Sequence, residues 1–208
     1  LPGYKPTLDP NPKMIQQAAN LIKNSKKPIL YVGGGIIHSK ANKELFDLAT
    51  KFNIPVVTTL MGRGAFPDGH ELCLEMPGMH GNYTATTSIQ KSDLLIAIGV
   101  RFDDRVTANP SFFAQNAKVI HADIDPAEIG KVREAQVPIV GDAKSVILGL
   151  IDALQDEELD TKNWINELNS MKTEHPLSYN QDENGPLKVP FVLEELQDLT
   201  EEGAIVVS

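Results

Sequence analysis

Residues 29–35 read Ile-Leu-Tyr-Val-Gly-Gly-Gly, so four apolar residues run directly into three glycines. An amphipathic helix pattern follows Ser39, and Ile54 to Thr58 is a second apolar run rich in β-branched residues. The inner face of the helix consists of Ala41, Leu45, Leu48, Ala49 and Phe52. Because a strand–helix–strand unit joins parallel strands by a right-handed crossover, we expect an α/β fold with a parallel sheet.

Four further apolar runs predict strands and bring the expected total to six. They are Leu72 to Met76, Leu94 to Ile98, Ala117 to His121 and Gln136 to Val140. Helix-start signals stand at Asn11-Pro12, near Asn82, at Asp125-Pro126 with Glu128, and after Asp142. The composition shifts at residues 155–158 (Gln-Asp-Glu-Glu), a segment with three acidic residues. Helices are expected around residues 161–172 and 189–199, followed by a strand from Ile205.

The bulk numbers exclude several kinds of partner. The 208 residues are 41% hydrophobic and 23% charged, which is typical of a globular protein, and the net charge is −9. An acidic chain disfavours a nucleic-acid or anionic-membrane surface, and no run is long enough to span a bilayer. Cys73 is the only cysteine, which excludes an internal disulfide and a cysteine-based metal site. We expect a cytoplasmic protein without a metal site in this chain.

Both ends of the sequence suggest a piece of a longer protein. The chain opens with Leu1-Pro2-Gly3, which is typical of a linker, and has no initiator methionine. It stops within the apolar run that begins at Ile205. We therefore expect one domain over residues 1–155. Residues 156–208 are expected to form a helical linker and the start of a further domain.

The charged loop after Ile98 is the first candidate site. Residues 99–107 read Gly-Val-Arg-Phe-Asp-Asp-Arg-Val-Thr, directly beyond a predicted strand. Ligands of open α/β sheets bind outside the carboxyl ends of the strands. The guanidinium groups of Arg101 and Arg105 are suited to bind a phosphate or carboxylate. The carboxylate of Asp103 is suited to accept a hydrogen bond from a ligand hydroxyl or ring N–H. The alternative is a solvated loop with surface ion pairs.

The glycine run is an incomplete dinucleotide fingerprint. Gly33 and Gly35 lack the third glycine of Gly-x-Gly-x-x-Gly, and no carboxylate follows Thr58 to hold a ribose. These departures argue against ordinary NAD binding. Glycine here indicates either close approach of a ligand to the backbone or a tight strand-to-helix turn.

Side chains that are suited to contact a ligand also follow the other predicted strands. Leu60, Met61 and Phe66 lie in a loop and need an apolar partner, either a flat ring or the body of the domain. His80 precedes a helix start and suits an anion or a structural role, while Asp123 has no evident local role and suits a ribose hydroxyl. Several strand ends acting together indicate one long ligand, such as an adenine dinucleotide.

Five motifs in this order resemble the central domain of acetohydroxyacid synthase (acetolactate synthase) large subunits. They are residues 59–62 (Thr-Leu-Met-Gly), 64–67 (Gly-Ala-Phe-Pro), 77–81 (Pro-Gly-Met-His-Gly), 99–107 and 123–131 (Asp-Ile-Asp-Pro-Ala-Glu-Ile-Gly-Lys). The resemblance covers nearly the whole chain, and the Arg-Phe-Asp-Asp-Arg-Val-Thr signature is specific to the FAD-containing branch. The chain departs from the family pattern at Glu75 and Ala108, where glycine is usual, and at Ala122, where a larger aliphatic residue is usual.

The resemblance implies a three-layer, Rossmann-like, six-stranded parallel sheet that binds FAD. The flavin and pyrophosphate would lie along Gly33, Gly34, Thr59, Leu60, Met61, Met79, His80, Gly81, Gly99, Val100, Arg101 and Asp103. The adenosine would approach Asp123, Ile124, Gly141 and Asp142. Arg105 would line the channel to the active site.

The resemblance also implies the reaction of the whole enzyme. Such enzymes decarboxylate pyruvate and join it to pyruvate or 2-ketobutyrate in branched-chain amino-acid synthesis, with thiamine diphosphate and Mg²⁺ held by flanking domains. The FAD is thought to be chiefly structural. No catalytic residue is expected in this chain, which should be inactive alone. The implied partners are the flanking domains, a homodimer or tetramer of catalytic subunits, and a small regulatory subunit.

Overall fold

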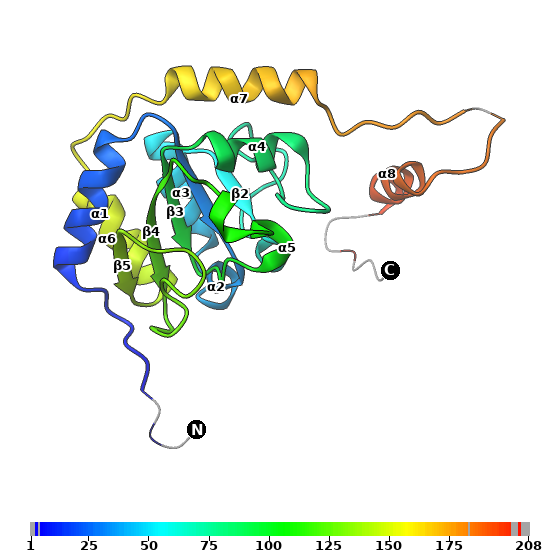
Figure 1. The fold of residues 1–208 in the computed structure, drawn as a ribbon. Helices are drawn as coiled ribbons and strands as arrows, with labels where there is room; N and C mark the ends of the chain where they lie inside the picture. The colour runs from blue at the N-terminus through cyan, green and yellow to red at the C-terminus, as the bar shows by residue number, and fades with distance from the viewer. Residues whose placement is uncertain (1–2, 4, 183, 201–203, 205–208) are drawn as a thin grey trace. The chain divides into compact units, whose positions relative to one another are not determined.

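Five parallel strands form one sheet in the order β2-β1-β3-β4-β5 (Figure 1). The computed structural model describes residues 3, 5–182, 184–200 and 204, and the chain divides into two compact units, Leu1–His175 and Pro176–Ser208. The sheet belongs to the first unit. Its strands are β1 (Pro28–Val32), β2 (Val56–Thr58), β3 (Leu94–Ile98), β4 (Lys118–Asp123) and β5 (Val137–Val140). The α/β class and the parallel sheet are confirmed.

Helices cover both faces of the sheet and give the first unit three layers (Figure 1). One face carries α1 (Pro12–Asn24), α2 (Gly34–His38), α3 (Asn42–Phe52) and α6 (Ala143–Ala153). The other carries α4 (Tyr83–Lys91) and α7 (Lys162–Glu174). The short α5 (Asp104–Thr107) follows β3, and 3-10 turns occupy Leu60–Gly62 and Pro110–Phe112.

The central strands are apolar throughout because both of their faces are covered. Every residue of β1 and β3 is buried. Leu30 and Val32 point into the core beneath α1, α3 and α6, whereas Ile29 and Tyr31 point into the core beneath α4 and α7. This alternation follows from the two-residue period of a strand. The continuous apolar runs of the sequence therefore predicted the buried strands correctly.

The strand order reverses between β1 and β3. The chain places β2 on one side of β1, and then β3, β4 and β5 on the other. At such a reversal the loops that follow the two flanking strands run to opposite faces, which leaves a crevice at the carboxyl edge of the sheet. Residues 33–35 and 99–103 follow the two strands that flank this crevice.

The prediction of a sixth strand at Leu72–Met76 is wrong, although by a narrow margin. This segment lies parallel to β2 and forms a single bridge between Val56 and Cys73. The Val56 N–H donates to the Leu72 carbonyl and the Leu74 N–H donates to the Val56 carbonyl, both at 2.8 Å. Glu75 then adopts a φ of 65°, which ends the extended backbone before a ladder can form.

Three of the four helix-start signals are confirmed. The side chains of Asn11, Asn82 and Asp142 cap α1, α4 and α6. The prediction at Asp125 is wrong, because residues 126–130 form turns and no helix. Asp125 does accept from the Ala127 N–H at 2.9 Å, but Gly130 turns the backbone to a φ of 74° within one helical turn.

The helix α7 is held against the rest of the first unit by the buried side chain of Trp164 and by an ion-pair cluster. The indole N–H of Trp164 donates to the Pro28 carbonyl at 3.1 Å. Glu167 accepts from Lys27 at 2.7 Å and from Lys91 at 3.0 Å, and the Lys27 ammonium lies 5.0 Å from the centre of the Trp164 ring. The predicted helix is confirmed.

The second unit contains α8 (Val189–Leu199), the helix expected around residues 189–199. Its first turn contains Pro190, which suits a helix start because the first N–H groups have no partner within the helix. The strand expected from Ile205 lies outside the described residues.

Candidate functional site

The ends of β1 and β3 are in backbone contact at the strand-order reversal. A Cβ on Gly33 would lie 2.4 Å from the Gly99 carbonyl oxygen, and one on Gly35 would lie 2.6 Å from the Gly99 Cα. The Gly35 N–H donates to the Gly99 carbonyl at 3.2 Å. Glycine at these three positions is therefore required by the tight strand-to-helix turn. Gly34 differs, since a Cβ there would be at ordinary contact distance from its neighbours, of which the nearest is the Met61 Cβ at 3.4 Å.

The loop after β2 presents two apolar side chains at this edge. The Thr59 hydroxyl accepts from the Gly62 N–H at 3.1 Å and shapes a turn over residues 60–62. Leu60 and Met61 on this turn are 69% and 70% exposed, whereas Phe66 is buried against Phe46 and the body of the domain. Leu60 and Met61 therefore have the open apolar surface expected of a ring-binding loop.

The loop at residues 77–81 rests on the backbone of α5. The Met79 N–H donates to the Arg105 carbonyl at 3.2 Å, and a Cβ on Gly78 would lie 2.6 Å from the same oxygen. Gly81 also has no room for a side chain, because a Cβ would lie 2.2 Å from the Met76 carbonyl. Met79 is 70% exposed and His80 is exposed.

Arg101 and Arg105 are exposed and form no ion pair with any residue that the structure describes. The surface ion-pair interpretation therefore lacks support for these two side chains. Asp103 caps α5 by accepting from the Arg105 N–H at 3.0 Å. This hydrogen bond lowers the pKa of Asp103, and the positive charges of Arg101 and Arg105 lower it further. The loop thus presents two exposed guanidinium groups that have no ion-pair partner among the described residues.

The carboxylates after β4 and β5 have local partners. The Oδ1 of Asp123 accepts from the Asp125 N–H at 2.9 Å, so the expectation of no local role is wrong. Burial raises the pKa of Asp123. Asp142 accepts from the Lys144 N–H at 3.0 Å as the cap of α6, and Gly141 lies against Pro10. These residues sit at the predicted strand ends but are partly committed to the fold.

The strand register aligns the candidate residues along one edge. Val32 pairs with Ile98, Ile98 with Ala122, and Asp123 with Val140. Gly33, Gly99 and Asp123 therefore come at equivalent levels of neighbouring strands. Because adjacent strands lie about 4.8 Å apart, the five strand ends extend over about 19 Å. The structure brings residues 33–34, 61, 99–105 and 78–79 into one contiguous group, while residues 123–124 and 141–142 form a second group beside it.

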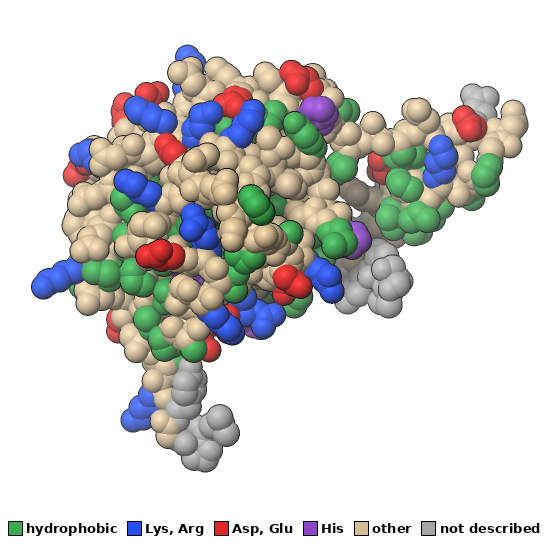
Figure 2. Space-filling view, in the orientation of Figure 1, with side chains coloured by type: hydrophobic (Ala, Val, Ile, Leu, Met, Phe, Trp, Pro, Cys, Tyr) green, Lys and Arg blue, Asp and Glu red, His purple; other side chains and the backbone are tan. Residues whose placement is uncertain are grey.

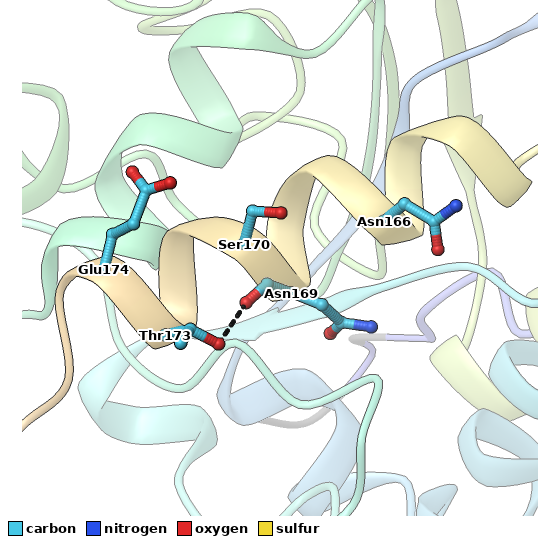
Figure 3. Close-up of a pocket in the computed structure, with 5 residues that line it drawn as sticks. All are labelled: Asn166, Asn169, Ser170, Thr173 and Glu174. Carbon is cyan, nitrogen blue, oxygen red and sulfur yellow. Dashed lines mark hydrogen bonds between the residues drawn. The ribbon is translucent and has the colours of Figure 1, made fainter.

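The surface over α2 and α5 is chemically mixed. In the space-filling view, hydrophobic and basic side chains lie close together in this region (Figure 2). A shallow hollow of about 490 Å³ lies elsewhere, along the exposed side of α7 (Figure 3). It is lined by five residues of that one helix, Asn166, Asn169, Ser170, Thr173 and Glu174. A single polar helix surface brings no separate elements together, so the carboxyl edge of the sheet is the stronger candidate.

The described part of the chain contains neither a metal-ion cluster nor a membrane-spanning helix. Its histidine, cysteine, aspartate and glutamate side chains form no group of three or more that could hold a metal ion. Its helices are all too short or too polar to cross a bilayer.

Sequence reasoning missed His121 and Tyr31. Both are buried polar residues within apolar strands, and His121 hydrogen-bonds to the loop that carries Arg101. The hydroxyl of Tyr31 is buried without a partner among the described residues, and this burial raises its pKa. Each of the two residues is a polar residue inside an apolar run, which could have drawn attention to it. The runs alone do not show which loop the side chain would contact.

Comparison with known proteins identifies the family of this chain. Residues 15–150 match the family model for the central domain of thiamine pyrophosphate enzymes, and the chain belongs to this family. It is similar over its whole length to acetolactate synthase of Mycobacterium avium, at 51% identity. It is 49% identical over 94% of its length to the acetolactate synthase large subunit of Corynebacterium glutamicum, and 43% identical over 99% to chloroplastic acetolactate synthase 1 of Nicotiana tabacum. The chain spans 34%, 32% and 31% of these three proteins.

Proposed function

We propose that this chain is the FAD-binding central domain of an acetolactate synthase large subunit. One observation carries the proposal. Two exposed guanidinium groups without ion-pair partners among the described residues lie at the point where the strand order reverses, beside the exposed side chains of Leu60, Met61 and Met79. A dinucleotide that carries a flat ring and a pyrophosphate needs this combination of apolar surface and positive charge.

The residues fit FAD part by part. Leu60, Met61 and Met79 offer apolar surface to the flavin, and Gly34 leaves the backbone open beside Met61. Arg101 suits the pyrophosphate. The row of strand ends continues to the carboxylate of Asp123, which suits the adenosine ribose. We assign the other predicted contacts to Gly33, Thr59, His80, Gly81, Gly99, Val100, Asp103, Ile124, Gly141 and Asp142.

In this proposal FAD supplies a rigid body that orders the edge loops, and the chemistry occurs elsewhere. The whole enzyme would condense pyruvate with pyruvate or 2-ketobutyrate, release CO₂, and use thiamine diphosphate and Mg²⁺ held by flanking domains. Arg105 would line the approach to that centre. We propose residues 1–155 as the FAD domain, residues 156–208 as a linker into a further domain, and a cytoplasmic enzyme. Its catalytic subunits would form a dimer or tetramer with a small regulatory subunit.

Two alternatives remain distinct from this proposal. In the first, the chain is a structural module whose FAD site is complete only with its neighbouring domains. In the second, the crevice takes NAD. The absence of a carboxylate after Thr58 argues against NAD, because that position holds the ribose in an ordinary NAD site.

A ligand titration separates the three possibilities. The purified 208-residue chain is titrated with FAD, NAD and ADP, and binding is followed by flavin fluorescence and by thermal unfolding. We expect saturable stabilisation that is largest for FAD, with about 2.7 kcal/mol at ~100 Kd. A well-folded chain that ignores all three ligands would favour the incomplete-site alternative. Preferential stabilisation by NAD would identify a different cofactor.

A further inference from the structure

The buried side chain of His121 joins two loops at the candidate site. His121 lies within β4 and is 0% exposed. Its Nε2 lies 2.9 Å from the Val100 carbonyl oxygen, in the loop after β3. Its Nδ1 lies 3.3 Å from the backbone nitrogen of Gly130, in the turns after β4. One imidazole thus connects the loop that carries Arg101 with the segment that follows Asp123.

These two contacts select one protonation state of the ring. The Gly130 N–H is a donor, so Nδ1 must be the unprotonated acceptor. The Val100 carbonyl is an acceptor, so Nε2 must carry the proton and donate it. The neutral Nε2–H form satisfies both contacts, whereas the cation would direct a second N–H at the Gly130 donor.

The loop itself alternates between buried and exposed residues. Val100 and Phe102 are buried, while Arg101 and Asp103 are exposed. Phe102 has a φ of 52°, an unfavourable value for a bulky residue, so its burial must hold the backbone in place. Its ring lies 4.9 Å from the His121 ring, 5.7 Å from Tyr31 and 6.1 Å from Phe113. His121 therefore contacts the residues on both sides of Arg101.

We propose that His121 is a positioning residue that holds Arg101 toward the ligand phosphate through the Val100 carbonyl. The inference rests on the proposed function, because it assumes an anionic ligand in the crevice. Loss of the hydrogen bond from Nε2 frees the backbone one residue before Arg101. Ligand binding must then order the Arg101 guanidinium, and the entropy lost in this ordering weakens the affinity for the ligand.

The surroundings of His121 favour its neutral form. Desolvation lowers the pKa of His121, while the Val100 hydrogen bond and the charges of Asp123 and Glu128 oppose that shift. The neighbouring strands β3 and β5 contain no titratable side chain, and the packed loop contributes Arg101 and Asp103. The neutral ring is therefore the state at pH 7.5. Protonation of Nδ1 would remove the acceptor of the Gly130 N–H and would leave the Nε2–H donor to Val100 in place.

The test compares substitutions that keep one contact each. His121→Gln retains a donor near the Nε2 position, whereas His121→Asn can only satisfy Gly130. FAD affinity is measured for both at pH 7.5, alone and combined with Arg101→Gln. We expect the Gln variant to stay within threefold of the parent and the Asn variant to bind at least tenfold more weakly. In the Arg101→Gln background, His121→Asn should change affinity by less than twofold.

A control and a ligand-free measurement keep the outcomes separate. Ile22→Val weakens the core beneath α1, on the other face of the sheet, and should leave FAD affinity unchanged. Equal FAD affinity of the parent and the Asn variant would overturn the positioning role. The same conclusion would follow if His121→Asn weakened FAD binding as much in the Arg101→Gln background as in the parent. If the parent itself does not bind FAD, the proposed function fails. The role of His121 is then judged from the rate of tryptic cleavage after Arg101. That rate should be at least tenfold higher in the Asn variant than in the Gln variant, and equal rates would contradict the inference.

Discussion

At the scale of single residues, the four arginines differ in what surrounds their guanidinium groups. Arg63 pairs with Asp68 at 2.8 Å, and Arg133 donates to the Ala114 and Ala117 carbonyls. Arg101 and Arg105 have no such partner among the described residues. The sequence could place these two arginines after a strand. It could not show that they lack an ion-pair partner among the described residues, since this depends on the loops around them.

Removal of the Arg101 charge should weaken FAD binding. We expect Arg101→Gln to raise the Kd for FAD at least tenfold, which is about 1.4 kcal/mol, because the pyrophosphate loses a bidentate partner. Lys118→Gln is the matched control. It removes one exposed positive charge at the amino end of β4, the opposite edge of the sheet. Flavin fluorescence titration measures both, and equal losses would contradict the site assignment.

The folded protein should be more stable with glycine in place of Ala108. Its φ of 49° and ψ of −108° lie outside the regions open to a residue with a Cβ. The resemblance led us to expect glycine at this position and at Glu75, which also has a positive φ. We expect Ala108→Gly to raise the free energy of unfolding by about 1 kcal/mol in urea denaturation. Ala153→Gly, within α6, should lower it by about 0.5–1 kcal/mol, and a loss at both positions would contradict the argument.

His121 should also leave a signature in the pH dependence of stability. Burial lowers its pKa in the folded chain below the ordinary value of 6.5, so the unfolded chain takes up the proton first as the pH falls. The free energy of unfolding should therefore be highest above pH 6.5 and should decrease from there toward the folded-state pKa. Urea unfolding between pH 8 and pH 5 measures this loss, and His121→Gln should reduce it. An identical pH profile for both proteins would refute the assignment.

At the scale of helices and strands, the sequence predicted correctly those features that depend on residues within one turn of the chain. The caps of α1, α4 and α6 could be predicted because an Asn or Asp side chain satisfies N–H groups two or three residues ahead. The helix predicted after Asp125 does not form because Gly130 turns the backbone to a positive φ. The predicted sixth strand does not form because Glu75 also has a positive φ. Backbone dihedral angles of this kind are not visible in a hydrophobic pattern.

The attachment of α7 depends on Trp164. We expect Trp164→Ala to lower the free energy of unfolding of the first unit by about 3–5 kcal/mol, because it leaves a cavity and an unpaired Pro28 carbonyl. Thr173→Ala is the control on the exposed side of the same helix and should stay within about 0.5 kcal/mol. Urea unfolding monitored by circular dichroism compares the two. Similar effects would indicate that the Trp164 side chain does not hold α7.

At the scale of the whole molecule, the α/β class followed from the sequence, but the strand order did not. A strand–helix–strand unit implies parallel strands, yet it leaves open whether the next strand adds beside β1 or beside β2. Addition of β3 beside β1 creates the reversal and therefore the crevice. The candidate residues were predicted one strand end at a time, and only the register shows that they share one edge.

FAD binding at this reversal of the strand order can be measured by NMR of the methionine methyl groups. Met61 and Met79 lie at the crevice, whereas Met14 lies in α1 and Met171 is buried in α7. The chain is labelled with methyl-¹³C methionine, assigned by single Met→Leu substitutions, and titrated with FAD. We expect the Met61 and Met79 signals to shift together with ligand occupancy while those of Met14 and Met171 stay in place. Saturable FAD binding that shifts Met14 or Met171 and leaves Met61 and Met79 unchanged would contradict it.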